Sequence, residues 1–355
     1  MSCMKVLVGL SGGIDSSIAA YLLKKEGYEV EGITMLVWKE DAPYPAPEGA
    51  NSCYCPEKKE DLDRIREICG RIGIKHTVVD CSDRFEEQIL GYFRSEYLSG
   101  RTPNPCIWCN RKIKFGAMVD YAREVTSFDR FATGHYARIT RRSDGRYELR
   151  KAVDLRKDQS YFLSRLSQEQ LSTALFPLGD HTKAEIRKID EALGFHEPGA
   201  SESQDFYAGD YTDLLQVEDR PGRIVMTDGR VLGRHNGYWH YTIGQRRGLN
   251  VAYTEPLYVI ALDAERNEVI VGTEGSTHSS SIYASDANYV SDEEFDDRIY
   301  SVKIRSAAKG APARVHAEGS GFRVGFLDYV KGAAPGQSAV VYDGDRVVAS
   351  GVITA

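Results

Sequence analysis

The feature that most constrains the fold is residues 5–17, where an apolar run meets a glycine turn and then the start of a helical pattern. Residues 6–8 are typical of a buried strand. Residues 11–13 (Ser-Gly-Gly) form a tight turn, and the helical pattern that begins at 15–17 ends at Gly27. A strand, a glycine loop and a helix start leave backbone N–H groups around a small space that suits a phosphate anion. The sequence therefore predicts a phosphate-binding loop.

The loop is neither of the two commonest nucleotide-binding loops. It lacks Gly-x-x-x-x-Gly-Lys-Ser/Thr and also Gly-x-Gly-x-x-Gly. Its Ser-Gly-Gly-Ile-Asp-Ser sequence resembles the pyrophosphate loop of the ATP pyrophosphatases, which split ATP between the α and β phosphates and adenylate a substrate. This resemblance assigns ATP binding to Gly9, Leu10, Ser11, Gly12, Gly13, Ile14, Asp15 and Ser16.

Length and composition indicate a multidomain globular protein. A chain of 355 residues is long for one core, so two or three domains are expected. No apolar run approaches the roughly 20 residues that span a bilayer, and no signal-peptide pattern opens the chain, so we expect a cytoplasmic protein without a membrane partner. The net charge of −7 means that an RNA-binding protein of this composition must gather its Lys and Arg on one face.

The periodicity predicts three regions. Up to about residue 205, strand and helix patterns alternate, which predicts an α/β fold with a parallel sheet covered on both faces. Ligands of such sheets bind beyond the carboxyl ends of the strands, where the glycine loop lies. Short alternating segments follow, and from about residue 276 the pattern is that of a small β-barrel. We expect an ATP pyrophosphatase domain at 1–205, a central domain at 206–275 and a barrel at 276–355.

Several separate segments together resemble one family, the tRNA-specific 2-thiouridylases. They lie in order along nearly the whole chain, at residues 9–17, 100–105, 109–115, 132–136, 157–163, 242–249 and 335–340. The resemblance implies ATP-dependent 2-thiolation of the wobble uridine of tRNA. ATP, with Mg²⁺, would adenylate the 2-oxygen of the uracil, and sulfur from an upstream donor would then displace AMP.

The resemblance also implies roles for individual residues outside the loop. Met35 and Gly134 match positions near the adenine, and Asn104, Pro105 and Cys106 match the segment that contacts the target base. The positions implied to contact tRNA elsewhere are His135, Lys157, Asp158, Gln159 and Gln337. Each of these could instead be an ordinary loop residue, and His135 could simply be a turn histidine bonded to a backbone group.

The chain departs from the family pattern at its sulfur chemistry. The family uses one cysteine after Thr-Pro-Asn-Pro-x-x, which is present here as Cys109. The second, in Ser-x-Gly-Ile-Cys-Phe, carries the persulfide, and this chain has Tyr207 at that position within residues 203–208. Because tyrosine cannot hold a sulfane sulfur, the two-cysteine route cannot run in its usual form.

Seven cysteines lie within the first 109 residues, and their odd number argues against a disulfide framework. Cys106 and Cys109 form a Cys-x-x-Cys, and Cys53 and Cys55 lie in an earlier loop. Joined by Cys53 or Cys55, the pair could hold a [4Fe-4S] cluster, in which three thiolates would leave one iron open. Alternatively, Cys106 and Cys109 could form a thiol pair that transfers a persulfide sulfur, or the four could bind structural zinc or be spectators.

Three functions remain open from the sequence. The first is a tRNA-uridine 2-sulfurtransferase in which a cluster or the Cys106/Cys109 pair delivers sulfur. The second is an adenylating enzyme that thiolates another tRNA base. The third is a tRNA-binding protein that has lost catalysis, against which the intact loop at residues 11–16 argues.

Overall fold

The structure is a computed structural model that describes residues 3–46, 52–56, 59–197, 199, 206–291 and 293–354. The chain forms two compact units. The first comprises Met1–Ile89, Cys106–Gly209 and Asp345–Val347, and the second comprises Leu90–Pro105, Asp210–Gly344 and Val348–Ala355. Within the described ranges, no helix has the length and apolar character needed to cross a membrane.

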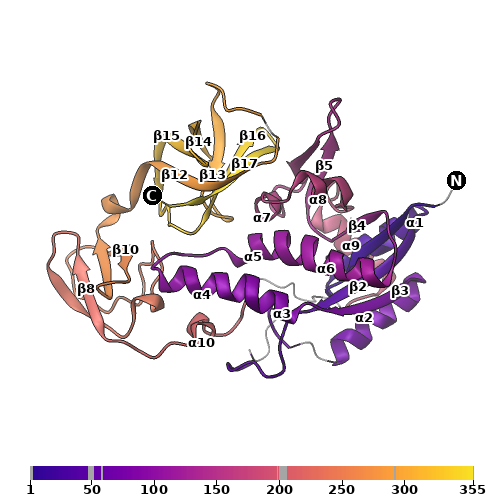
Figure 1. Cartoon of the computed structure of the whole chain (residues 1–355), viewed down its shortest axis with the longest axis horizontal. Coiled ribbons are helices and arrows are strands. Elements are labelled where there is room, and N and C mark those ends of the chain that lie inside the picture. Colours follow the sequence, from indigo (N-terminus) through magenta and orange to yellow (C-terminus); the bar gives the residue numbers. More distant parts are fainter. Residues whose placement is uncertain are drawn as a thin grey trace. The chain divides into compact units, whose positions relative to one another are not determined.

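A five-stranded parallel sheet forms the centre of the first unit (Figure 1). Its order is β3-β2-β1-β4-β7, so the first strand of the chain lies in the middle. Val6 is paired with Val30 on one side and with Arg130 on the other, and it is fully buried. The strands are β1 (Lys5–Gly9), β2 (Glu29–Leu36), β3 (Lys75–Asp80), β4 (Arg130–Ala132) and β7 (Ala174–Leu175).

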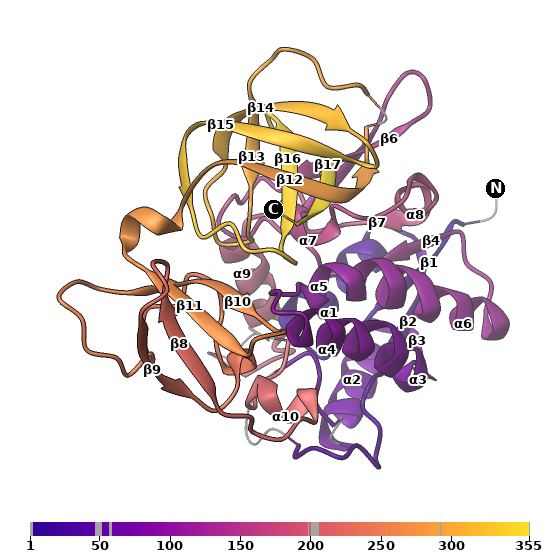
Figure 2. The same ribbon diagram turned by 60° about the vertical axis from the view of Figure 1, so that its left-hand side comes forward.

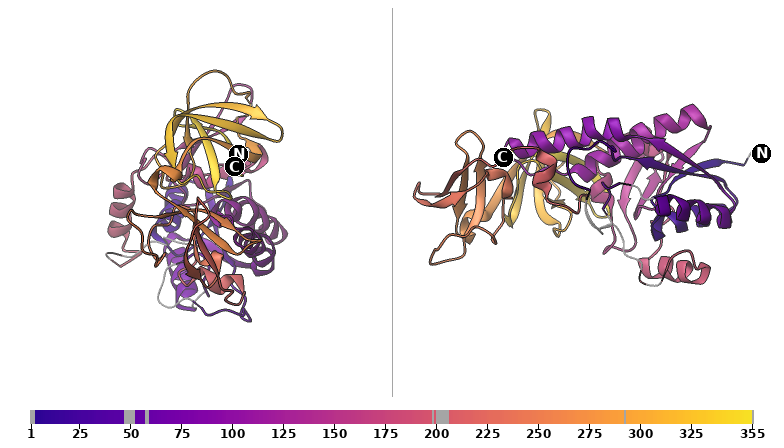
Figure 3. Two further views of the ribbon diagram at one scale, coloured as in Figure 1. Left: turned by 90° about the vertical axis from the view of Figure 1, so that its left-hand side faces the viewer. Right: turned by 90° about the horizontal axis from the view of Figure 1, so that it is seen from below.

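Helices cover both faces of this sheet, as the alternating pattern predicted (Figure 3). One face packs its even-numbered β1 residues, Val6 and Val8, into a core with residues of α1 (Ile14–Lys25) and α2 (Lys59–Ile72). On the other face, Phe131 of β4 packs edge-on against Phe115, which precedes α6 (Met118–Val125). The apolar run thus forms a buried parallel strand.

Two helical stretches contain π-helical turns that the sequence patterns did not reveal. The sequence pattern predicts one helix over 85–97, but the structure has α3 (Ser82–Phe85), a π-turn at Glu86–Leu90 and α4 (Gly91–Leu98). The basic segment after α5 (Pro105–Trp108) is a π-helix, Cys109–Ala117. Gln170 donates hydrogen bonds from Nε2 to the carbonyls of Arg111 and Phe115, at 2.7 and 2.8 Å. It therefore satisfies carbonyl groups of this wider helix.

Gln170 belongs to one of two capping boxes that the sequence predicted and the structure confirms. Ser167 caps α8 (Gln168–Thr173) with Gln170, and Thr182 caps α9 (Lys183–Leu193) with Glu185. In each box the hydroxyl accepts from the third helical N–H, and the longer side chain accepts from the cap N–H. The short helices are α7 (Ser160–Leu163) and α10 (Tyr211–Leu215).

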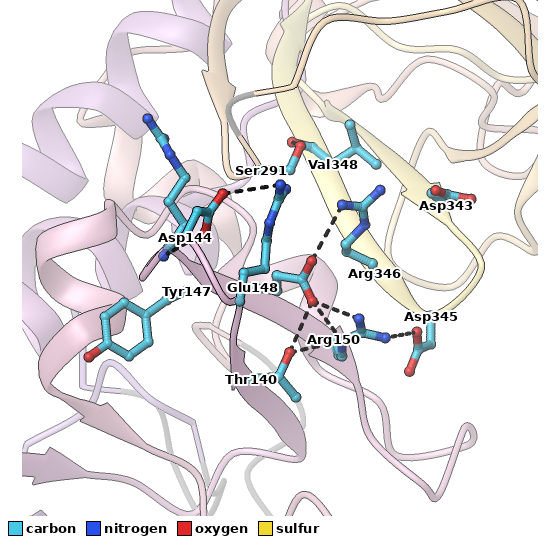
Figure 4. Close-up of polar contacts among 12 residues, drawn as sticks. Thr140, Asp144, Tyr147, Glu148, Arg150, Ser291, Asp343, Asp345, Arg346 and Val348 are labelled. Carbon is cyan, nitrogen blue, oxygen red and sulfur yellow. Dashed lines mark hydrogen bonds and ion pairs between the residues drawn. The ribbon is translucent and has the colours of Figure 1, made fainter.

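The hairpin expected around Asp144-Gly145 is formed by β5 (Ala137–Arg141) and β6 (Tyr147–Lys151). A buried carboxylate stabilises it (Figure 4). Glu148 accepts from Arg150 at 2.6 Å and lies 3.4 Å from Arg346, and Arg150 also pairs with Asp345 at 2.7 Å. Residues 195 and 198 positions apart in the sequence thus share one ionic network, which the local pattern did not predict.

The second unit contains two β-structures, which Figure 2 shows in orange and yellow. The central sheet has the order β10-β11-β8-β9, with strands Gly222–Met226 (β8), Val231–His235 (β9), Tyr258–Asp263 (β10) and Glu268–Gly272 (β11). In the barrel, β12 pairs with both β15 and β17 and so closes the sheet. Its strands are β12 (His278–Tyr289), β13 (Tyr300–Lys303), β14 (Ala311–Glu318), β15 (Gly321–Lys331), β16 (Ser338–Asp343) and β17 (Arg346–Ile353).

The barrel was predicted from its last five strands, and β12 was missed. The interior of the barrel is apolar and includes Phe322 and Val324, both fully buried. The boundaries expected at 205/206 and 275/276 stay a prediction, and residue 205 lies outside the described residues.

Candidate active site

The glycine turn lies at the carboxyl edge of the parallel sheet. Its start is fixed by β2, because the Leu10 N–H donates to the Ile33 carbonyl and the Leu10 carbonyl accepts from Thr34 Oγ1, both at 2.8 Å. Ser16 Oγ accepts from the Ser11 N–H at 3.2 Å and donates to the Gly13 carbonyl at 3.1 Å. The loop is therefore closed on the first turn of α1, and its N–H groups lie at a helix N-terminus, where an anion is stabilised.

Asp15 is held from two other segments of the first unit. Tyr136 Oη donates to Asp15 Oδ1 at 2.8 Å, and Lys183 Nζ donates to the same oxygen at 2.7 Å. The Lys183 side chain is 8% exposed and that of Asp15 is 27% exposed. Within the described part of the chain, Oδ2 takes no hydrogen bond, so one carboxylate oxygen is anchored and the other remains available.

Gly134 lies directly against the same turn. A Cβ at this position would lie 2.7 Å from both the Asp15 carbonyl carbon and the Ser16 nitrogen. Because both atoms are backbone, neither can move aside cheaply. The structure thus brings together two of the sequence-predicted ATP segments, residues 9–16 and Gly134. Met35, half-buried near the end of β2, is at the same edge of the sheet.

His135 follows Gly134 and is bonded locally. Its Nδ1 lies 2.7 Å from Thr133 Oγ1, and its ring packs near Phe115 and Phe176. Burial and the charge of Lys114 hold the pKa of His135 well below its ordinary value, so the ring is neutral at pH 7. Its assignment to tRNA stays a prediction.

Three of the predicted sulfur-chemistry cysteines lie around one lysine. Cys109 begins the π-helix and Lys114 follows five residues later, the spacing of a π-helical hydrogen bond. Burial alone would lower the pKa of Lys114, but the negative charge that Cys109, Cys53 and Cys106 carry when they ionise raises it overall. Burial raises the pKa of Cys109 to about 11, although the Lys114 charge opposes this change. At neutral pH the Cys109 side chain is therefore a thiol beside an ammonium group.

The fourth predicted cysteine makes a different contact. The Cys55 thiol donates to the Ser52 carbonyl at 3.3 Å. Across the residues that the structure describes, no three His, Cys, Asp or Glu side chains are placed to share a metal ion. The assignment of a cluster or a zinc ion to Cys53, Cys55, Cys106 and Cys109 therefore stays a prediction.

Tyr207 is a buried packing residue, 1% exposed. Its hydroxyl donates to the Pro45 carbonyl at 2.9 Å, and its ring packs against Tyr54, which lies between Cys53 and Cys55 in the sequence. Tyr207 thus joins the cysteine loop to the segment after α9. Residues 203–205 of the predicted motif lie outside the described residues.

The loop predicted to contact tRNA at 157–159 is tied to its own surroundings. Asp158 accepts hydrogen bonds from the Ala152 and Ser160 N–H groups, at 3.1 and 3.2 Å. Gln159 Oε1 accepts from the Tyr136 N–H at 2.9 Å. Both side chains thus position the chain locally, while Lys157 is half-buried.

In the second unit, Gln337 and the segment before Asn104 are in direct contact. Gln337 Nε2 donates to the carbonyls of Thr102 and Pro103, at 3.1 and 3.0 Å. The Thr102 N–H donates in turn to the Pro335 carbonyl at 2.8 Å. Gln337 is therefore held against the two residues that directly precede Asn104 in this unit.

Sequence reasoning missed three residues of the site. Tyr136 and Lys183 contact Asp15, and Lys114 interacts electrostatically with the thiols. Nothing in the sequence distinguishes Lys183 from other residues in the first turn of a capped helix. Only the five-residue spacing from Cys109 to Lys114 could have suggested their contact, and only if the π-helix had been known.

The comparisons with known proteins cover almost the whole chain. The family described as tRNA methyl transferase HUP domain matches residues 4–207. The tRNA methyl transferase PRC-barrel domain matches residues 214–273, and the aminomethyltransferase beta-barrel domain matches residues 279–353. The fold is thus a HUP domain, a PRC-barrel domain and a C-terminal β-barrel.

Individual relatives agree with these matches. The tRNA-specific 2-thiouridylase MnmA of Endomicrobium trichonymphae is 45% identical over 356 residues, covering 99% of each chain. The MnmA proteins of Synechococcus sp. and Moorella thermoacetica are each 43% identical, covering 98% of this chain and 97% and 98% of theirs. Identity at this level over the full length, together with the glycine loop and its Asp15 anchor, shows that the chain belongs to the tRNA-specific 2-thiouridylase family.

Proposed function

We propose that the protein is an ATP-dependent tRNA-uridine 2-sulfurtransferase that acts on the wobble uridine, in the cytoplasm. The observation that carries this proposal is the closed turn at residues 10–16, with Gly134 packed against it, in a chain that belongs to this family over its whole length. The proposed partners are tRNA and an upstream sulfur donor.

In the first step, the loop N–H groups would hold the phosphates of ATP while the uracil 2-oxygen attacks the α-phosphorus. A new oxygen–phosphorus bond forms, and the bond to pyrophosphate breaks. The oriented N–H groups stabilise the charge that develops on the leaving phosphates. Met35 and Gly134 would lie near the adenine, and the anchored Asp15 keeps the first turn of α1 in place.

Mg²⁺ would neutralise part of the phosphate charge when bound with ATP. The residues present fit it, because Asp15 keeps one carboxylate oxygen without a hydrogen bond in the described part of the chain. Phosphate oxygens and a carboxylate are the ligands that Mg²⁺ prefers.

For sulfur delivery, we propose the Cys106/Cys109 thiol pair. A persulfide on Cys109 would attack C2 through its terminal sulfur, and AMP would leave with the former 2-oxygen. The Cys106 thiolate would then attack Cys109 Sγ, which forms a disulfide between the two cysteines and leaves sulfur on the base. The sulfane sulfur is reduced and both thiols are oxidised, so each cycle requires a thiol reductant.

This route is supported by the one-turn spacing of the two cysteines and by Lys114, whose positive charge stabilises a sulfur anion nearby. Tyr207 would have taken over a packing role at the position of the second family cysteine. Cys53 and Cys55 would then be dispensable for chemistry.

Purified protein, incubated with ATP, unmodified tRNA and a persulfide donor, tests both parts of the proposal. We expect tRNA-dependent formation of AMP and pyrophosphate, with 2-thiouridine appearing in the tRNA. Cys109→Ser and Cys106→Ser should abolish thiolation, whereas Cys55→Ser should retain it. Formation of ADP instead of AMP would contradict the adenylation step. Full activity in Cys106→Ser, or its loss in Cys55→Ser, would contradict the thiol-pair route.

A further inference from the structure

A buried histidine beyond the end of α9 contacts the glycine turn. His196 Nε2 lies 3.0 Å from the Gly12 carbonyl oxygen, and its Nδ1 lies 2.7 Å from Asp190 Oδ1. The side chains of His196 and Asp190 are 3% and 4% exposed. The contact joins positions 184 residues apart in the sequence. It has no part in the proposed adenylation or sulfur transfer.

The partners of the ring determine the direction of both hydrogen bonds. A carbonyl oxygen can only accept, so Nε2 carries the hydrogen that is donated to Gly12. The contact between Nδ1 and the Asp190 carboxyl group is favourable only with a proton between them. The ring is thus held from both sides, and turning it over would lose both bonds.

The bond to Gly12 fixes the plane of one peptide of the loop. No described peptide bond is cis, so the Gly12 carbonyl and the Gly13 N–H point in opposite directions. The Gly13 N–H is therefore directed away from His196. Gly13 is the N-cap of α1, and its own carbonyl accepts from Ser16 and Ser17 inside the helix. The Gly13 N–H thus lies on the side of the loop opposite His196.

Two successive glycines make this restraint important. Gly12 has φ +75, and a glycine pair can rotate its shared peptide at little steric cost. If the peptide turned over, the loop would present a carbonyl oxygen to the ligand, which repels a phosphate. The donor on His196 opposes that rotation.

We propose that His196 is a positioning residue for ATP, which holds the Gly12–Gly13 peptide in the orientation that presents the Gly13 N–H to the phosphate chain. The inference rests on the proposed function, because it takes ATP as the ligand of the loop. Asp190 in turn positions His196.

Three substitutions test the two hydrogen bonds of the His196 ring separately. His196→Asn keeps a donor where Nδ1 was and loses the contact to Gly12. His196→Gln places a donor where Nε2 was and so keeps the hydrogen bond to the Gly12 carbonyl. Asp190→Asn can donate to Nδ1 and leaves the Nε2 hydrogen bond in place. His181→Gln, just before the same helix, is the matched control.

We expect His196→Asn to raise the Kd for a non-hydrolysable ATP analogue, and the KM for ATP, roughly tenfold, with kcat at saturating ATP within about twofold of wild type. His196→Gln, Asp190→Asn and His181→Gln should bind within about threefold of wild type. Wild-type affinity in His196→Asn, or equal weakening in all three variants at His196 and Asp190, would overturn the inference.

A measurement on the wild-type protein remains informative even if His196→Asn does not fold. The ATP analogue should slow hydrogen exchange at the Gly13 amide about tenfold or more. Unchanged exchange with the analogue bound would overturn the role of His196 but leave the proposed ATP site intact. If the wild-type protein does not bind the analogue at all, the proposed ATP site is wrong, and the inference is wrong with it.

Discussion

At the scale of single residues, the ATP loop depends on contacts from distant parts of the chain. Asp15 is bonded to Tyr136 and Lys183, Gly12 to His196, and the backbone of Asp15 and Ser16 lies against Gly134. Six residues of sequence specify where the loop lies, whereas more distant residues determine how it is held.

Gly134→Ala should weaken ATP binding strongly. Its Cβ would come within 2.7 Å of two backbone atoms of the first turn of α1, and the loop would have to move. We expect affinity for an ATP analogue, measured by calorimetry, to fall about 100-fold, because the oriented N–H groups would be displaced. Gly70→Ala is the control: its Cβ would meet nothing within 4 Å, and alanine favours its helix. Unchanged affinity in Gly134→Ala would show that ATP does not depend on this packing.

The cysteines should differ in reactivity according to their burial. Burial raises the pKa of Cys69 to about 11 and that of Cys81 to about 12, and their side chains are 2% and 1% exposed. Cys3 is exposed. Because the thiolate is the reactive form, iodoacetamide at pH 8 should modify Cys3 and leave Cys69 and Cys81 unmodified until the protein is denatured. Peptide mass spectrometry gives the result, and rapid labelling of Cys81 in the native protein would contradict it.

At the scale of elements, regular periodicity made the parallel sheet and the barrel predictable. The run at Val6–Val8 and the capping boxes at Ser167 and Thr182 are local signals, and the structure confirms them. The π-helix Cys109–Ala117 was not predictable, because its freed carbonyls are satisfied by Gln170, more than 50 residues away. The ion-pair network of β6 was missed for the same reason.

The Glu148 network should make stability depend on pH. Burial would raise the pKa of Glu148, but hydrogen bonds from Arg150 and Thr140, with the charges of Arg150 and Arg346, lower it below 4.5 overall. The unfolded chain therefore takes up this proton at a higher pH than the folded chain. The stabilisation is complete above about pH 4.5 and is lost as the pH falls through the folded value.

Glu148→Gln should accordingly lower the free energy of unfolding by about 2 kcal/mol at pH 7, because the arginines lose a buried anionic partner. The difference from wild type should shrink as the pH falls below 4.5, and it should vanish below the folded pKa, where Glu148 is protonated in both states. Urea denaturation at several pH values measures this, with Glu169→Gln, at an exposed position of α8, as the control. An equal loss of stability in Glu148→Gln at every pH would contradict the assignment.

At the scale of the whole molecule, the sequence predicted the three-part architecture and the family, because the matching segments are spread over the full length. It could not predict which cysteines would be neighbours. The charge of Cys53 acts on the pKa values of Cys109 and Lys114, which lie far from it in the sequence, and the neighbouring Tyr54 packs against Tyr207. The sulfur chemistry proposed for these cysteines therefore depends on tertiary contacts.

The central claim is that this protein places sulfur on a tRNA uridine. The most direct measurement is mass spectrometry of tRNA nucleosides from a strain that lacks the gene, complemented with wild-type protein or with Cys109→Ser. We expect 2-thiouridine derivatives to disappear in the deletion strain, to return with the wild-type protein and to remain absent with Cys109→Ser. Unchanged 2-thiouridine in the deletion strain would contradict it.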